Sequence, residues 1–85
     1  MIYLFGIKDK TANAFLQYIP YKNVSLIRRE LSNVVNTPSK SLMYTNCEDF
    51  SCFQLGVINE ETGKITSLDE PKLEFNFTDL KTNVN

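Results

Sequence analysis

The stretch that decides the fold is residues 48–68, EDFSCFQLGVINEETGKITSL. Apolar residues in its first half fall on alternate positions, a period typical of a β-strand: Phe53, Leu55 and Val57. Asn59–Gly63 follows as a turn, and Gly63 accepts a positive φ at no steric cost. The β-branched Ile65 then opens a returning strand. We therefore predict a β-hairpin whose first strand covers Phe50–Ile58.

The returning strand is expected to end at Asp69-Glu70-Pro71, because Pro71 has no N–H to give to a sheet. Beyond it, apolar and polar residues alternate again from Leu73 to Phe77. This pattern predicts either a fifth strand on the chain's own sheet or an arm that adds to a partner. Leu80–Asn85 is expected to be a frayed tail.

Two more strands are predicted before the hairpin. Ile2–Ile7 is almost continuously apolar, and Ala14–Ile19 is a second candidate that ends at Pro20. The polar loop between them favours an antiparallel pair that joins Tyr3 and Phe5 to Phe15 and Tyr18. The N-terminus lacks a basic leader and a small-residue cleavage site, so we expect neither a signal peptide nor a membrane span.

Residues 23–36 form the clearest predicted helix. Asn23 suits the N-cap, and Pro38 drives the residue before it out of helical space. Apolar side chains recur at helical spacing and predict one buried stripe: Val24, Ile27, Leu31, Val34 and Val35. Arg29 is expected on the solvent side, while the stem of Arg28 can lie on the sheet.

These elements predict an α+β fold, with a small antiparallel sheet of four to five strands and one helix packed on one face. We expect one domain over residues 1–73 and a C-terminal arm or tail over residues 74–85. A chain of 85 residues buries only a thin core, which favours a homodimer or a higher homo-oligomer.

The composition argues against an enzyme. The chain has no His, so Ser-His-Asp and Cys-His catalysis are excluded, as are zinc sites with imidazole ligands. The two cysteines, Cys47 and Cys52, are expected to be reduced structural thiols. No catalytic residue, metal or cofactor is predicted, and we expect a soluble cytoplasmic protein.

The charge distribution is uneven along the chain. Residues 1–42 carry six basic and two acidic side chains, whereas residues 43–85 carry three basic and eight acidic ones. A basic face could contact phosphates, and aromatic rings could stack on unpaired bases; an ordinary solvated surface and buried core aromatics are the alternatives. The candidate nucleic-acid-binding residues are Lys8, Lys10, Lys22, Arg28, Arg29, Lys40, Tyr18 and Tyr21, and Tyr44 and Phe53 are further ring candidates.

Three blocks of the chain resemble the small non-structural protein of gokushovirus-type microviruses, which are single-stranded DNA phages. The blocks are KDKTANAF at residues 8–15, RELSNVVNTPS at residues 29–39, and residues 48–63 with Glu70-Pro71 behind them. The chain departs from the family pattern at Cys47, Cys52 and Asn59, and residues from Phe75 onward have no clear counterpart.

The resemblance implies a non-capsid phage protein that binds single-stranded DNA and acts in the switch from genome replication to single-strand synthesis and packaging. It carries over no catalytic residue. Arg29, Lys8 and Lys10 are the basic positions inside the matching blocks. The alternative is a protein–protein adaptor that regulates phage or host replication proteins without touching DNA. Affinity that falls steeply with salt would favour the DNA-binding reading.

Overall fold

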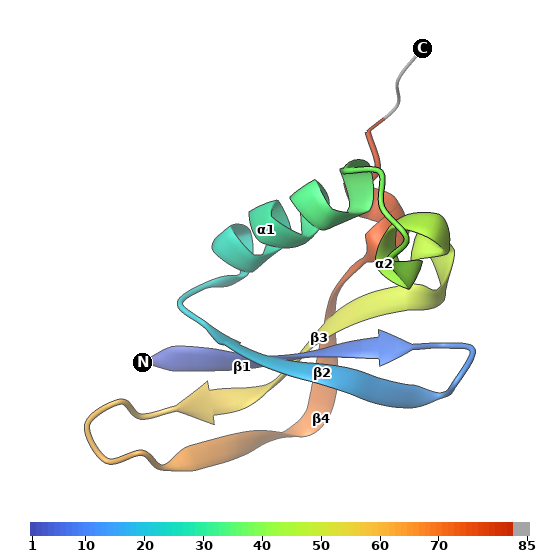
Figure 1. The fold of residues 1–85 in the computed structure, drawn as a ribbon. Helices are drawn as coiled ribbons and strands as arrows, with labels where there is room; N and C mark the ends of the chain where they lie inside the picture. Colours follow the sequence, from blue (N-terminus) through green and yellow to red (C-terminus); the bar gives the residue numbers. More distant parts are fainter. Residues whose placement is uncertain (83–85) are drawn as a thin grey trace.

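The computed structural model describes residues 1–82, which form a four-stranded antiparallel sheet with its helices gathered on one side (Figure 1). This confirms the predicted α+β class. The strands are β1 (Ile2–Asp9), β2 (Ala14–Tyr21), β3 (Phe50–Ile58) and β4 (Ile65–Asn76), in the sheet order β2-β1-β3-β4. The helical elements are α1 (Val24–Asn36), the short α2 (Leu42–Thr45), and the single 3-10 turns η1 (Cys47–Asp49) and η2 (Phe77–Leu80).

The β3–β4 hairpin has the predicted turn. Gly63 has a φ of 75°, and its N–H donates to the Asn59 carbonyl at 2.7 Å. The Asn59 side chain also accepts from the N–H of Glu61 at 2.9 Å, as a turn-forming Asx residue does. β3 has the predicted bounds, and Phe53 and Val57 pair with both β1 and β4. Leu55 has no partner in either ladder, because the register shifts between Gln54 and Gly56 on both sides.

Both proline boundaries were wrong, for one physical reason. β2 runs through Pro20, and β4 runs through Pro71. Both strands are edges of the sheet, where a proline can turn its nitrogen away from the ladder. Along β4 the register also shifts, so that Gln54 pairs with Lys72 and Gly56 with Ser67, which leaves residues 68–71 without a partner in the ladder.

The pairing of β1 with β2 is antiparallel as predicted, with different partners. Tyr3 lies opposite Tyr21, and Phe5 lies opposite Ile19. The predicted partner Phe15 instead lies opposite Lys8, beyond a β-bulge that follows Ile7. A bulge adds one residue to one strand and so moves every later pair.

Residues 74–80 belong to the core, where the sequence predicted an arm or a tail. Phe75 continues β4 against β3, and no fifth strand forms within residues 1–82. Phe77 and Leu80 lie in η2 and are buried under the end of α1. Residues 83–85 of the predicted tail lie outside the described part of the chain.

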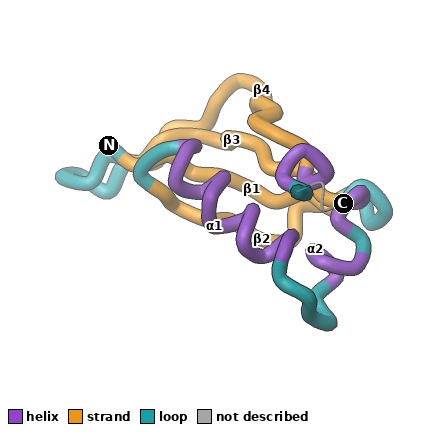
Figure 2. The backbone as a smooth tube through the Cα atoms, turned by 90° about the horizontal axis from the view of Figure 1, so that it is seen from above, coloured by secondary structure: helices purple, strands orange, loops and turns teal. Residues whose placement is uncertain are grey.

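α1 packs one stripe on the sheet, and Figure 2 shows it lying over β1 and β2, oblique to the strands. Its N-cap is Asn23, as predicted, with the side-chain oxygen accepting from the Leu26 N–H at 2.9 Å. The stripe was wrong at Val34, which is 38% exposed. The buried residues are spaced by four, and Val34 is turned about 100° away from the last of them. They are Ile27, Leu31 and Val35, packed with Phe5, Ile7, Phe50, Cys52, Phe75, Phe77 and Leu80.

The end of α1 is tied to the C-terminal segment by one side chain. The Asn36 amide donates to the Leu80 carbonyl at 2.8 Å, and its oxygen accepts from the Thr82 N–H at 2.9 Å. The same amide donates to the Ser32 carbonyl one turn earlier, at 2.8 Å. Asn36 therefore satisfies polar groups of both elements and fixes η2 beneath the helix.

Candidate nucleic-acid interface

The side of the sheet that faces away from α1 is covered by no helix among the described residues (Figure 1). Cross-strand partners lie on the same face of a sheet, so the register gives the composition of this side. Gly6 lies between Tyr18 on β2 and Phe53 on β3, and Phe53 lies opposite Leu73 on β4. We call this side the uncovered face.

Three aromatic rings gather on the uncovered face: Phe15, Tyr18 and Phe53, which we call the ring cluster. Phe15 meets Phe53 edge-to-face, with ring centroids 5.6 Å apart and planes at 80°. Its centroid lies 6.3 Å from that of Tyr18, whose side chain is 62% exposed. Edge-to-face pairs of this kind hold aromatic rings in fixed orientations. The cluster is therefore a packed aromatic surface in which Tyr18 is exposed and Phe15 and Phe53 are half-buried.

Lys8 is the predicted cation that the structure brings to the ring cluster. It lies directly opposite Phe15 on the neighbouring strand, and its Nζ is 5.8 Å from the Phe15 ring centroid. This distance is within the range of a cation–π interaction. Lys8 thus sets one positive charge beside rings that could stack on bases.

Lys10 and Lys22 lie at opposite ends of the β1–β2 hairpin. Lys10 follows β1 in the turn, and its N–H donates to the Asp49 carbonyl at 2.8 Å, next to the acidic η1. Lys22 follows β2 at the start of α1 and lines a shallow cavity with Leu26. Lys40 lies in the exposed loop between α1 and α2.

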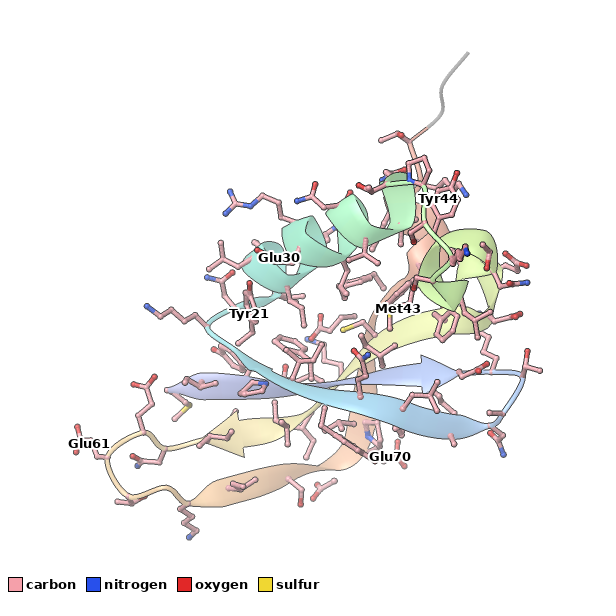
Figure 3. All side chains as sticks on the ribbon, in the orientation of Figure 1. Tyr21, Glu30, Met43, Tyr44, Glu61 and Glu70 are labelled. Carbon is pink, nitrogen blue, oxygen red and sulfur yellow. The ribbon has the colours of Figure 1, made fainter. Side chains whose placement is uncertain are left out.

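Tyr21 and Tyr44 lie on the helix side. Tyr21 packs against the core, beside Glu30 (Figure 3). Burial, followed by the Glu30 carboxylate, raises the pKa of the Tyr21 phenol above its ordinary value. Tyr44, on α2, has Lys81 Nζ at 5.2 Å from its ring centroid. Neither ring belongs to the ring cluster.

Arg29 lies on the outer side of α1, whereas Arg28 lies at the edge of the buried stripe, over Phe75. They line a groove of about 360 Å³ between α1 and η2, together with Asp79. The Arg28 guanidinium also lies 5.2 Å from the Phe75 ring centroid, which agrees with the prediction that its stem packs on the sheet. The groove has mixed charge, with two cations and one carboxylate in its wall.

The predicted basic residues therefore do not form one cluster. Lys8 lies on the uncovered face, whereas Arg29 lies on α1 across the sheet from it. Acidic side chains are carried largely by the second half of the chain, and Figure 3 shows Glu61 at the hairpin tip and Glu70 on β4. Only Lys8 and Tyr18 of the eight predicted residues belong to the uncovered face described above.

Sequence reasoning named none of three members of this face as binding residues: Phe15, Gly6 and Leu55, whose side chain lies over Gly6. Phe15 was expected to pair with the apolar residues of β1. In a regular strand, Phe15 and Tyr18 would point to opposite sides because their spacing is odd. The bulge after Ile7 brings them to one side. Their aromatic character was the only available signal.

The cysteines are buried and unbonded, as predicted. Burial, followed by the Glu74 carboxylate, raises the pKa of the Cys52 thiol to about 12. A thiol with this pKa stays protonated near neutral pH and is a poor nucleophile. Residues 1–82 contain no cluster of three or more potential metal-binding side chains and no helix long and apolar enough to cross a membrane.

The fold and the uncovered face define a small α+β domain with a sheet surface available for binding. Residues 2–80 match the family described as Phage ORF5 protein. The match covers nearly the whole chain, and the protein belongs to this family of phage proteins. No curated protein and no solved structure was found to match the chain.

Proposed function

We propose that this phage protein is a non-structural accessory protein, with no enzymatic activity, that binds single-stranded DNA on the uncovered face. The ring cluster carries the proposal: ordered aromatic rings on an open sheet, with Tyr18 62% exposed. Stacking of an unpaired base on an aromatic ring contributes about 1–3 kcal/mol. Bases inside a duplex are already stacked and do not reach such a surface, so single strands are the favoured ligand.

The charge of the face sets the character of this binding. Lys8 provides one phosphate contact beside Phe15, while Leu73 and Leu55 add apolar surface. Each phosphate contact on a single strand adds about 0.7 to the slope of log K against log salt. The face should therefore bind mainly by stacking, with a shallow salt dependence. A cluster of several basic residues would instead give an affinity that falls steeply with salt.

The biological role follows from the family and from the resemblance noted in the sequence. A gokushovirus-type non-structural protein would act in the switch from genome replication to single-strand synthesis and packaging. It would do so in the cytoplasm of the infected bacterium, outside the capsid, with phage replication or packaging proteins as partners. Membership of the phage family supports this role, and the ring cluster supplies its binding surface.

A second candidate function is a protein–protein adaptor. Leu73 is 49% exposed on the uncovered face, and Leu16 on β2 is 52% exposed. Exposed apolar surface of this kind also fits a protein partner, including a second copy that forms the expected homodimer. The two candidates place different ligands on the same face, so one set of variants separates them.

The test replaces Tyr18 in two ways. Tyr18→Leu keeps an apolar side chain and removes the ring, while Tyr18→Phe keeps the ring and removes only the hydroxyl. Fluorescence anisotropy with oligothymidine and with a matched duplex should show that the wild type and Tyr18→Phe prefer the single strand. Tyr18→Leu should bind the single strand about fivefold to a hundredfold more weakly.

Light scattering on the same variants reports the adaptor candidate. Equal affinity of wild type and Tyr18→Leu for the single strand would overturn the proposal. A dimer that dissociates on Tyr18→Leu, with no binding of either oligonucleotide, would assign the uncovered face to a second copy.

A further inference from the structure

Gly6 occupies the middle of the uncovered face, and its neighbours fill the space that a side chain would take. A Cβ atom built on Gly6 would lie 2.6 Å from Leu55 Cδ1 and 2.8 Å from Phe15 Cδ1. Both distances are shorter than carbon atoms approach without repulsion. The absence of a side chain at Gly6 is therefore what lets Phe15 and Leu55 fold across β1.

The backbone does not explain a glycine at this position. Among the described residues, Gly63 is the glycine with a positive φ. Gly6 sits within β1, and strand interiors are weakened by glycine, because glycine loses more conformational freedom and packs no side chain. Gly6 is also not a bulged residue, because it is paired to Tyr18 on one side and to Phe53 on the other. Close approach of another group is the reason left for a glycine here, and Phe15 and Leu55 are the groups that approach.

Phe15 joins the other parts of the uncovered face. Its ring stands edge-to-face on Phe53, lies next to Tyr18 and has the Lys8 ammonium 5.8 Å from its centroid. A shift of Phe15 would therefore change the position of each of these contacts. A binding surface gains affinity when its groups are already held in the bound arrangement.

We propose that Gly6 is a positioning residue of the uncovered face: it seats Phe15 so that the ring cluster and Lys8 are arranged for unpaired bases. The choice of ligand rests on the proposed function. The position of Phe15 is a property of the protein without DNA and can be tested separately. Gly6 does not touch the DNA; it acts through Phe15.

The clash at Gly6 is of a kind that displaces side chains without breaking the sheet. Both contacts are to side-chain atoms rather than to backbone, and these side chains can rotate. Gly56 offers the opposite case, because a Cβ there would clash with the Thr66 backbone oxygen. Gly6→Ala should therefore fold and lose the ring arrangement, whereas Gly56→Ala should damage the β3–β4 ladder itself.

The first measurement uses the free protein. The Phe15 ring should shift the NMR signals of the Lys8 side-chain protons, because the two residues lie opposite each other and Lys8 Nζ is 5.8 Å from the ring centroid. In Gly6→Ala, these signals should move toward the values of a lysine without an aromatic neighbour. Unchanged Lys8 signals in a folded Gly6→Ala protein would overturn the positioning role, whether or not the protein binds DNA.

The second measurement is the Kd for oligothymidine, taken well below the melting temperature. Gly6→Ala should weaken binding about fivefold or more, as expected when one base loses its stacking partner. If Gly6 is needed only for stability, Gly6→Ala will lower the melting temperature and leave both the Kd and the Lys8 signals unchanged. That result would also overturn the proposal.

A second pair of variants keeps the test decisive if Gly6→Ala does not fold. Leu55→Ala removes the closest contact, and Gly6→Ala/Leu55→Ala adds the methyl group that still meets Phe15. The double variant should show shifted Lys8 signals and weaker binding relative to Leu55→Ala. Equal values for the two proteins would overturn the proposal. Failure of the wild type to bind oligothymidine would instead overturn the proposed function, and the Lys8 signals would still decide the role of Gly6.

Discussion

The two faces of the sheet differ in what covers them. The face toward α1 buries Phe5, Ile7 and Cys52 beneath the helix, each 1% exposed or less. The opposite face carries aromatic side chains of similar size, yet Tyr18 is 62% exposed on it. Apolar character alone therefore does not separate core from surface in this protein. What separates them is which face the α1 stripe and η2 close over.

This difference assigns separate tasks to the two faces. Burial on the covered face supplies the stability of a small domain, because buried apolar area is the dominant favourable term in folding. The ring cluster on the uncovered face is covered by no helix among the described residues, and it leaves the Tyr18 ring exposed. Substitutions on the covered face should change stability first, and substitutions on the uncovered face should change binding first.

The largest expected effect comes from the covered face. Leu31→Ala should lower the free energy of unfolding by about 2–5 kcal/mol, because it leaves a cavity between α1 and the sheet. Val34→Ala, on the same helix, should cost about 1 kcal/mol or less, because Val34 is 38% exposed. Denaturant titration measures both. Similar losses for the two variants would show that the helix packs in a different rotation.

A smaller effect should appear with pH, also on the covered face. The Cys52 thiol releases its proton at about 9.0 in the unfolded chain and, with its pKa raised by burial, at about 12 in the folded protein. The unfolded state is therefore favoured as the pH rises through this window, by up to about 1.4 kcal/mol per pH unit from this group. Below pH 9.0 the Cys52 thiol is protonated in both states, and its burial contributes fully to the stability of the folded protein.

The control for this pH dependence is Cys52→Ala, which lacks the thiol. Its unfolding free energy should fall less steeply than that of the wild type between pH 9.0 and 12, whatever its value at neutral pH. Parallel curves would mean that Cys52 is hydrated in the folded protein and that water reaches the covered face.

The smallest effect distinguishes the faces by charge. Lys8→Gln should lower the slope of log K against log salt for oligothymidine by about 0.7, one phosphate contact on a single strand. Arg29→Gln removes the same charge on the outer side of α1 and should leave the slope unchanged. The reverse result would move the DNA to the helix side and to the groove between α1 and η2.

Much of the fold was predictable because it depends on local patterns. The turn at Gly63 and the cap at Asn23 are set by one or two residues, and both were confirmed. The ring cluster was not predictable in this way. It depends on the β-bulge between the Ile7–Gln17 and Lys8–Phe15 pairs. A bulge is decided by the fit of two strands rather than by the sequence of one.

The same reason explains the errors along β4 and at the candidate site. Pro71 ends a strand only where its N–H would be needed, and the shifted register of β4 removes that need. No short-range sequence pattern relates Lys10 to Arg29. That they lie apart could therefore be seen only from the arrangement of β1 and α1 in the fold. The sequence shows a glycine at position 6, but it does not show that Phe15 and Leu55 pack over it.

The hydrogen bonds of Asn36 set the moment at which this chain can finish folding. Synthesis delivers β1 and α1 first, yet the partner of the Asn36 amide, the Leu80 carbonyl, follows 44 residues later. Phe75 and Phe77, which complete the core under α1, also emerge late. Until residue 80 is available, the apolar stripe of α1 can pack on β1 and β3 but lacks the cover of Phe75, Phe77 and Leu80. The core of this domain is therefore complete only when its last buried residue has been added.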